Sequence, residues 1–184
     1  MKRAQAVDPL SLIASAALGW VHFYGRDYES AVEQCRRTLE LNPEFELAHL
    51  WAGWAEESAG RHAAAVEHLS SAVRLSSGGA VARASLGRAQ ALAGDRAAAE
   101  RTLADLQRDH AGYLPAFELA KLHLALDDTE RAMAWLQRAY LERSHSMVFL
   151  NVDPQLDVLR SDPRFVTLAE RVAPVATVIA HVPR

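Results

Sequence analysis

The sequence predicts an all-α, right-handed superhelical solenoid of helix-turn-helix repeats, with a helical cap at its C-terminal end. The prediction depends on a period of 34 residues, which three columns of small or apolar residues follow in phase. The columns are Gly19, Gly53, Gly87 and Ala120; Ala31, Ala65, Ala99 and Ala132; and Cys35, Leu69, Leu103 and Leu136. The last step of each column is one residue shorter. Such a period is typical of helix pairs that stack around one continuous core.

The small residues of the first two columns have a steric explanation. Glycine or alanine at a helix crossing lets the two axes approach to about 8 Å. Glycine inside a helix costs on the order of 1 kcal/mol relative to alanine, so three glycines indicate a gain from close packing. We therefore expect the glycines at the closest crossing of each pair, with the alanine column facing them.

We expect four helix pairs, in repeats that span residues 10–43, 44–78, 79–112 and 113–143. The expected helices are 10–24 and 28–41, 45–59 and 62–75, 80–93 and 96–110, and 114–126 and 129–142. Gly25, Gly60 and Gly94 mark turns inside the first three pairs, and Pro43 prevents its helix from continuing. Residues 1–9 align with the end of the first repeat, so we interpret them as the remnant of a preceding repeat.

The period ends after the fourth repeat, and we expect residues 144–173 to cover the open end of the array. Residues 144–152 show no helical pattern and are interpreted as an extended connector. Two helix starts follow, at Asp153-Pro154 and at Asp162-Pro163, where a capping side chain precedes a proline. The apolar residues expected to form the cap are Leu156, Leu159, Phe165 and Leu168.

Composition and charge exclude several classes of protein. Half of the 184 residues are apolar, 23% are charged, and the formal net charge is −3. This mixed charge predicts no nucleic-acid partner for the segment. No apolar stretch reaches the roughly 20 residues that span a bilayer, so we expect no membrane segment in this chain. The single cysteine, Cys35, lies in a core column, and we expect a buried, unreactive thiol.

The stretch from Leu18-Gly19-Trp20 to Leu41-Asn42-Pro43 resembles one tetratricopeptide repeat, and it recurs along the chain. The C-terminal stretch, with Val152-Asp153-Pro154 and 159–165, resembles a signature of repeat arrays in bacterial signalling proteins. In that group the array follows a winged-helix regulator, a Ser/Thr kinase or a nucleotide cyclase. The resemblance covers residues 4–172 and leaves the tail, 174–184, unassigned. It implies a cytoplasmic module, or the periplasmic part of a membrane-anchored parent protein.

The function predicted from these features is a non-enzymatic module that binds a protein or peptide as the regulatory or sensory part of a signalling protein. We find no catalytic constellation, and we expect no cofactor and no metal site, because the histidines are scattered. Two alternatives stay open. The array could dock the substrate of a multidomain kinase, cyclase or glycosyltransferase, or it could mediate self-association into a homo-oligomer.

The candidate binding site is a groove on the inner surface, formed by the first helix of each repeat. Its residues are Trp20, Tyr24, Trp51, Trp54, Arg88, Glu118 and Lys121. The order of these residues along the chain predicts an aromatic surface over repeats one and two and a cationic surface over repeats three and four. The expected ligand is an extended peptide with apolar or aromatic side chains at one end and acidic side chains at the other. The alternative is that the tryptophans pack against neighbouring helices or are covered by the preceding repeat of which residues 1–9 are the expected remnant.

Overall fold

The structure is a computed structural model and describes residues 11–108 and 114–172. These residues form helices and connecting turns, with no strand among them, which confirms the predicted all-α repeat fold. The helix pairs are α2 (Leu12–Tyr24) with α3 (Tyr28–Leu41), α4 (Glu46–Ser58) with α5 (His62–Leu75), α6 (Ala80–Leu92) with α7 (Arg96–Arg108), and α8 (Ala116–Ala125) with α9 (Thr129–Leu141). The expected remnant, 1–9, and the tail, 174–184, lie outside the described residues.

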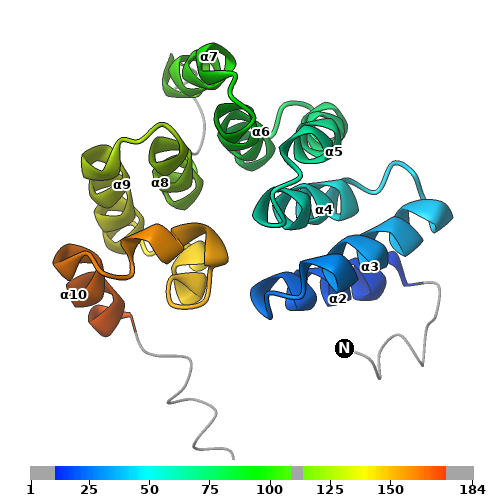
Figure 1. The fold of residues 1–184 in the computed structure, drawn as a ribbon, viewed down its shortest axis with the longest axis horizontal. Coiled ribbons are helices and arrows are strands. Elements are labelled where there is room, and N and C mark those ends of the chain that lie inside the picture. The colour runs from blue at the N-terminus through cyan, green and yellow to red at the C-terminus, as the bar shows by residue number, and fades with distance from the viewer. Residues whose placement is uncertain (1–10, 109–113, 173–184) are drawn as a thin grey trace, which may run out of the picture.

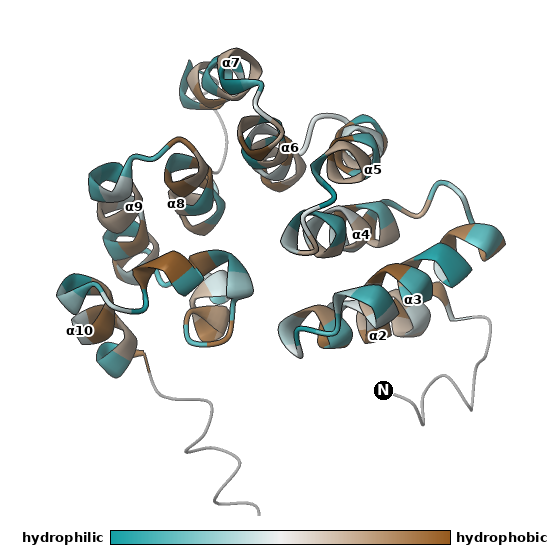
Figure 2. Ribbon diagram, in the orientation of Figure 1, coloured by the Kyte–Doolittle hydropathy of each residue, from teal (hydrophilic) through white to brown (hydrophobic). Residues whose placement is uncertain are grey.

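The pairs follow one another along an arc (Figure 1), and α4, α6 and α8 lie nearer to its inside than their partners α5, α7 and α9. Hydrophobic and hydrophilic residues share each helix (Figure 2), as expected where one side of a helix is packed and the other faces water. Among the described helices, none is both long and apolar enough to cross a membrane.

Aspartates begin the second helix of three pairs. The side chains of Asp27, Asp95 and Asp128 each accept a hydrogen bond from a backbone N–H three residues later, at 3.2, 3.0 and 3.0 Å respectively. These bonds satisfy N–H groups that have no partner inside the helix. Arg61 takes this position before α5, and its side chain instead pairs with Glu29 and Glu56. A recurring local bond therefore explains where these helices begin.

The glycine column lies at the closest helix crossings, as predicted. A Cβ atom added at Gly53 would lie 2.5 Å from Leu69 Cγ, and one at Gly19 would lie 2.7 Å from Cys35 Sγ. At Gly87 the nearest atom is Thr102 Cγ2, at 3.1 Å. The alanine column faces the glycines only in part: the Ala31 carbonyl oxygen would lie 3.0 Å from a Cβ atom at Gly19. The side chains that meet the glycines come from the third column in repeats one and two, although all four alanines are fully buried.

The C-terminal segment consists of two 3₁₀ helices, η1 (His145–Phe149) and η2 (Pro154–Leu159), followed by α10 (Pro163–Arg171). The expectation of an extended connector over 144–152 is therefore wrong. Met147 and Leu150 are buried and three residues apart, which matches the three residues per turn of a 3₁₀ helix. The expected capping residues are confirmed. Leu156, Leu159, Phe165 and Leu168 are buried in one cluster with Met133 and Leu136 of α9.

Candidate functional site on the concave surface

The predicted groove residues all lie on the inner helices, but only some of them border the same cavity. Trp20, Tyr24, Trp51, Trp54 and Glu118 line a cavity of about 360 Å³ on the inside of the arc. Leu50, Val81 and Phe117 complete its array side, and His145, Ser146 and Phe149 close it from the C-terminal segment. Arg88 and Lys121 are not among the residues that line it.

The tryptophans differ in exposure. Trp54 is buried, packs in the core beside Phe23, and donates a hydrogen bond from Nε1 to Ser85 Oγ at 2.9 Å. It therefore fits the alternative that tryptophans pack between helices. Trp20 and Trp51 are half-buried and stack with ring centroids 5.9 Å apart. These two rings are therefore more accessible than that of Trp54.

The C-terminal segment places an aromatic ring on this surface. The Phe149 ring lies 4.9 Å from Trp20 in an edge-to-face arrangement, and it stacks on Tyr24 at 4.8 Å. Both separations fall in the favourable range for aromatic pairs. Sequence reasoning missed Phe149 because the segment was interpreted as extended. The three-residue spacing of Met147 and Leu150 is the signal that could have indicated a 3₁₀ helix and its side-chain directions.

Further contacts hold the C-terminal segment against the array. Asp157 accepts two hydrogen bonds from the guanidinium of Arg26, at 2.5 and 2.7 Å. Gln155 Nε2 donates to Glu57 Oε1 at 3.0 Å. These bonds join η2 to the end of α2 and to α4. The segment thus contacts the start of the array as well as its last helix pair.

The structure corrects the charge of the concave surface. Arg88 forms an ion pair with Glu57, and Lys121 Nζ lies 2.6 Å from Glu118 Oε2 and 3.3 Å from Asp153 Oδ2. Lys121, Glu118 and Asp153 are all buried. The two cations are therefore neutralised beneath the surface, and the expected cationic half of the groove is not exposed for a ligand. The repeat pattern did not indicate that Glu57 and Asp153 pair with these cations.

We call these five side chains, Glu57, Arg88, Glu118, Lys121 and Asp153, the buried charge cluster. Burial lowers the pKa of Arg88 to about 10, although Asp153 and Glu118 oppose the shift. Burial also raises the pKa of Glu118, and Lys121 is the main group that opposes it. With every group ionised, three carboxylates face two cations, and in that state the cluster carries one excess negative charge.

Part of the sequence is similar to a known protein family. The tetratricopeptide repeat family model matches residues 3–80. Over these residues the chain consists of tetratricopeptide repeats. Helices α6–α9 continue the same helix-pair arrangement beyond the matched residues. No curated protein matches the chain. Tetratricopeptide repeats in general mediate protein–protein interaction, which implies protein partners for the array.

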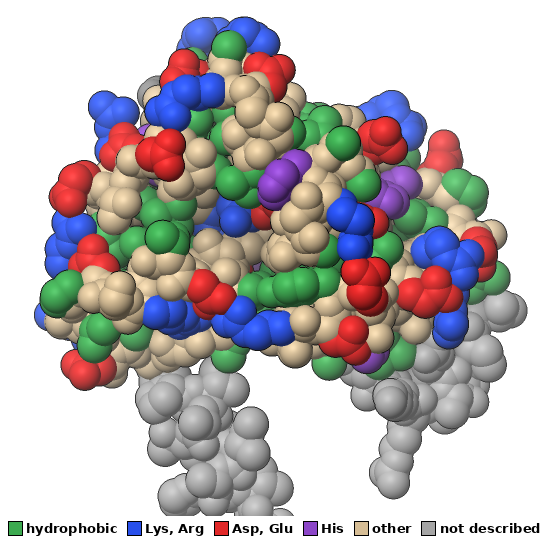
Figure 3. Space-filling view, in the orientation of Figure 1, with side chains coloured by type: hydrophobic (Ala, Val, Ile, Leu, Met, Phe, Trp, Pro, Cys, Tyr) green, Lys and Arg blue, Asp and Glu red, His purple; other side chains and the backbone are tan. Residues whose placement is uncertain are grey.

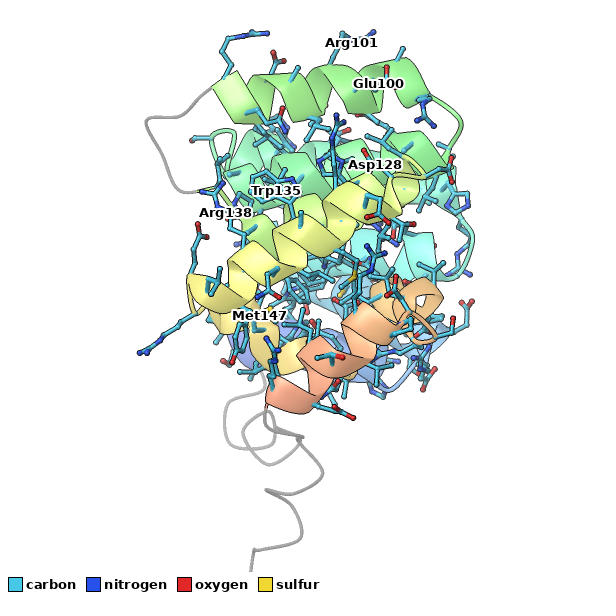
Figure 4. The ribbon with its side chains drawn as sticks, turned by 90° about the vertical axis from the view of Figure 1, so that its left-hand side faces the viewer. Glu100, Arg101, Asp128, Trp135, Arg138 and Met147 are labelled. Carbon is cyan, nitrogen blue, oxygen red and sulfur yellow. The ribbon has the colours of Figure 1, made fainter. Side chains whose placement is uncertain are left out.

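The outer face of the repeat array carries another tryptophan, which does not line the cavity. Trp135 lies on α9 next to Arg138, whose guanidinium carbon is 4.8 Å from the ring centroid (Figure 4). On the face seen in Figure 3, acidic and basic side chains are mixed, without a large patch of one sign. Among the described residues, no group of three histidine, cysteine or acidic side chains could hold a metal ion.

Proposed function

We propose that this repeat protein is a non-enzymatic module whose concave surface binds a short, aromatic-bearing segment of a partner protein in a 3₁₀ conformation like that of η1. The position of Phe149 carries the proposal. The 3₁₀ helix η1, outside the repeats, already presents this ring to Trp20 and Tyr24. The partner's segment would present an aromatic side chain in the same position and would compete with the chain's own residues.

The expected affinity is moderate. An aromatic side chain buries on the order of 150–250 Å², which corresponds to about 4–6 kcal/mol at about 25 cal/mol per Å². Association costs of about 4–15 kcal/mol offset most of this gain, even after further contacts are added. The chain's own segment competes at the high effective concentration of a tethered group. The aromatic side chain alone therefore gives weak binding, and a readily exchangeable partner is expected, with any tighter affinity supplied by the further contacts.

We further propose that the module is the regulatory part of a larger bacterial signalling protein, located in the cytoplasm. The C-terminal stretches Val152-Asp153-Pro154 and 159–165 support this, because they resemble the corresponding parts of repeat arrays in such proteins. The full reading frame that encodes this chain tests it. A kinase, cyclase or winged-helix domain in the same frame is expected, and a frame that encodes only an unrelated transporter or secreted enzyme would contradict it.

The binding proposal is tested with a peptide of the chain's own residues 144–153, added to the Phe149→Ala protein. This variant lacks the competing ring, so it should bind the peptide more tightly than the wild type does. Adding Trp20→Ala should weaken binding about 10-fold or more, as truncation of a hot-spot aromatic residue does. Trp135→Ala, in the same background, is the matched control and should leave binding unchanged.

Fluorescence anisotropy of a labelled peptide measures the affinity, and a thermal melt by circular dichroism verifies that each variant is folded. A peptide with Phe149→Ala should bind much more weakly than the parent peptide. Equal binding of the two peptides, or equal losses in the Trp20 and Trp135 variants, would contradict the proposed site.

A further inference from the structure

The cavity beside Phe149 is walled mainly by aromatic rings. Trp20, Trp51, Trp54, Phe117 and Phe149 border its volume of about 360 Å³, together with Tyr24. This volume is within the usual range for ligand pockets. Aromatic faces attract cations electrostatically, and several rings around one cavity are the arrangement that recognises ammonium groups. The walls therefore favour a cation with an aliphatic stem.

The charges near the cavity favour the same sign. Glu118 is buried and lies in the cavity wall. When Glu118 and Asp153 are both ionised, they share the single charge of Lys121 while Arg88 is paired with Glu57, so one negative charge is in excess. Burial raises the pKa of the Tyr24 hydroxyl, and the charges of Asp153 and Glu118 raise it further.

The protein already holds one ammonium group, buried beside the cavity, against two of the rings and the carboxylate that also line the cavity. Lys121 Nζ lies 4.9 Å from the Trp54 ring centroid and 5.1 Å from that of Phe117, in addition to its contact with Glu118. An alkylammonium group is thus stable here against aromatic faces and a buried carboxylate. A second cation would neutralise the excess charge that Lys121 leaves.

The geometry of η1 gives the direction from which such a cation would enter. Ser146 and Phe149 both line the cavity and are three residues apart. In a 3₁₀ helix, residues at this spacing lie on the same side. A long side chain at the place of Ser146 would therefore start at the cavity edge while the aromatic ring keeps its position.

We propose that the cavity binds the side-chain ammonium of a lysine, located three residues before the aromatic residue in the partner's segment. This inference rests on the proposed function and names the chemistry of its ligand. Lysine is preferred over arginine because a guanidinium has five N–H donors, and the mostly aromatic wall would leave several of them unsatisfied. The expected ligand is thus aromatic and basic, whereas the sequence pattern predicted an aromatic and acidic one.

The test compares four peptides of residues 144–153 that differ only at one position: Ser146→Lys, Ser146→norleucine, Ser146→Arg and Ser146→Glu. Norleucine keeps most of the aliphatic stem and lacks the charge. Binding to the Phe149→Ala protein is measured at about pH 8, where histidine side chains are neutral. The lysine peptide should bind roughly 10-fold more tightly than the norleucine peptide. The arginine peptide should be intermediate and the glutamate peptide the weakest.

Glu118→Gln, in the same protein background, should remove most of the preference for lysine and leave the norleucine peptide nearly unaffected. Because Glu118 is buried beside Lys121, a second variant keeps the test decisive if this one fails to fold. Trp51→Leu removes a half-buried wall of the cavity and should also reduce the ratio of lysine to norleucine affinity. Trp135→Leu, on α9, is the matched control and should preserve the ratio.

The outcomes separate the two proposals. If the aromatic ring of the peptide matters but lysine and norleucine bind equally, the cavity does not select a cation and this inference alone fails. A preference for glutamate would restore the expectation drawn from the sequence and would also overturn it. If no peptide binds, or binding is independent of the ring at position 149, both this inference and the proposed function fail.

Discussion

Replacing Lys121 by methionine tests whether the buried charge cluster depends on its central cation. Methionine has a similar length and no charge, so the substitution removes the ammonium group without opening a large cavity. Glu118 and Asp153 would then be left as buried carboxylates with Arg88 as the remaining cation of the cluster. The side chains of Lys121, Glu118 and Asp153 are 2%, 7% and 0% exposed, so solvent cannot replace the lost partner.

Breaking a buried ion pair by removing one partner costs about 3–5 kcal/mol, and we expect a loss of this size at about pH 7.5. The matched control is Arg36→Met on α3. Arg36 also contacts two carboxylates, Glu33 and Glu40, but its side chain is 55% exposed. Exposed pairs contribute about 0–1 kcal/mol, so the control should lose little stability.

The loss of stability in Lys121→Met should depend on pH. Burial already raises the pKa of Glu118 above its ordinary value of 4.5, and removing Lys121 removes the main opposing group. A carboxyl with a raised pKa binds more protons in the folded state than in the unfolded state, so stability falls as pH rises above the ordinary value. The deficit of Lys121→Met should therefore be smaller at about pH 5 than at about pH 7.5.

Urea denaturation followed by circular dichroism measures these differences. The triple variant Lys121→Met, Glu118→Gln and Asp153→Asn removes the uncompensated charges and should recover most of the lost stability. The reasoning is refuted if Lys121→Met loses no more stability than Arg36→Met. A deficit that stays constant between the two pH values would also contradict it.

Three further predictions concern the core and the histidines. Gly53→Ala should lower the free energy of unfolding by about 1 kcal/mol or more, because overpacking against Leu69 at 2.5 Å exceeds the gain in helix propensity. Gly87→Ala, with 3.1 Å to Thr102, should be nearly neutral in the same urea titration. The pKa of His68 is lowered by burial and then by His49, whose Nδ1 lies 3.2 Å away, so stability should fall as pH falls below about 6.5. His68→Gln should flatten this decrease, and an unchanged slope would count against the explanation. Burial raises the pKa of the Cys35 thiol to about 12, so an aromatic disulfide reagent should react only as the protein unfolds. Fast labelling that depends on reagent concentration would show that the thiol is accessible.

The repeat fold was accessible from the sequence because its determinants are local and periodic. The ends of α3 and α5 fall at the predicted residues, where a turn precedes each helix and the apolar pattern stops. The glycine column identified the close crossings for the same reason. These features recur every 34 residues, so each copy supports the interpretation of the others.

The chemistry of the concave surface was less accessible, because it depends on contacts between distant parts of the chain. The repeat pattern placed Arg88 and Lys121 on inner helices, but it could not show that Glu57 and Asp153 neutralise them. Asp153 lies in the non-repeating segment, whose path over the array has no periodic signal. Phe149 was missed for the same reason. The sequence therefore predicted the helices that carry the site, but not which side chains are covered.

The hydrogen bonds between Arg26 and Asp157 join residues that are 131 positions apart. In most repeat arrays each unit contacts only its neighbours, so the ends can unfold separately. Here the first helix pair is bound to the C-terminal segment, and the contacts of the array close into a loop. Unfolding from either end must first break the contacts between the first helix pair and the C-terminal segment. This requirement should make the array unfold as one cooperative unit. A partner that displaces Phe149 would weaken the same closure and allow the first helix pair to move away from the C-terminal segment.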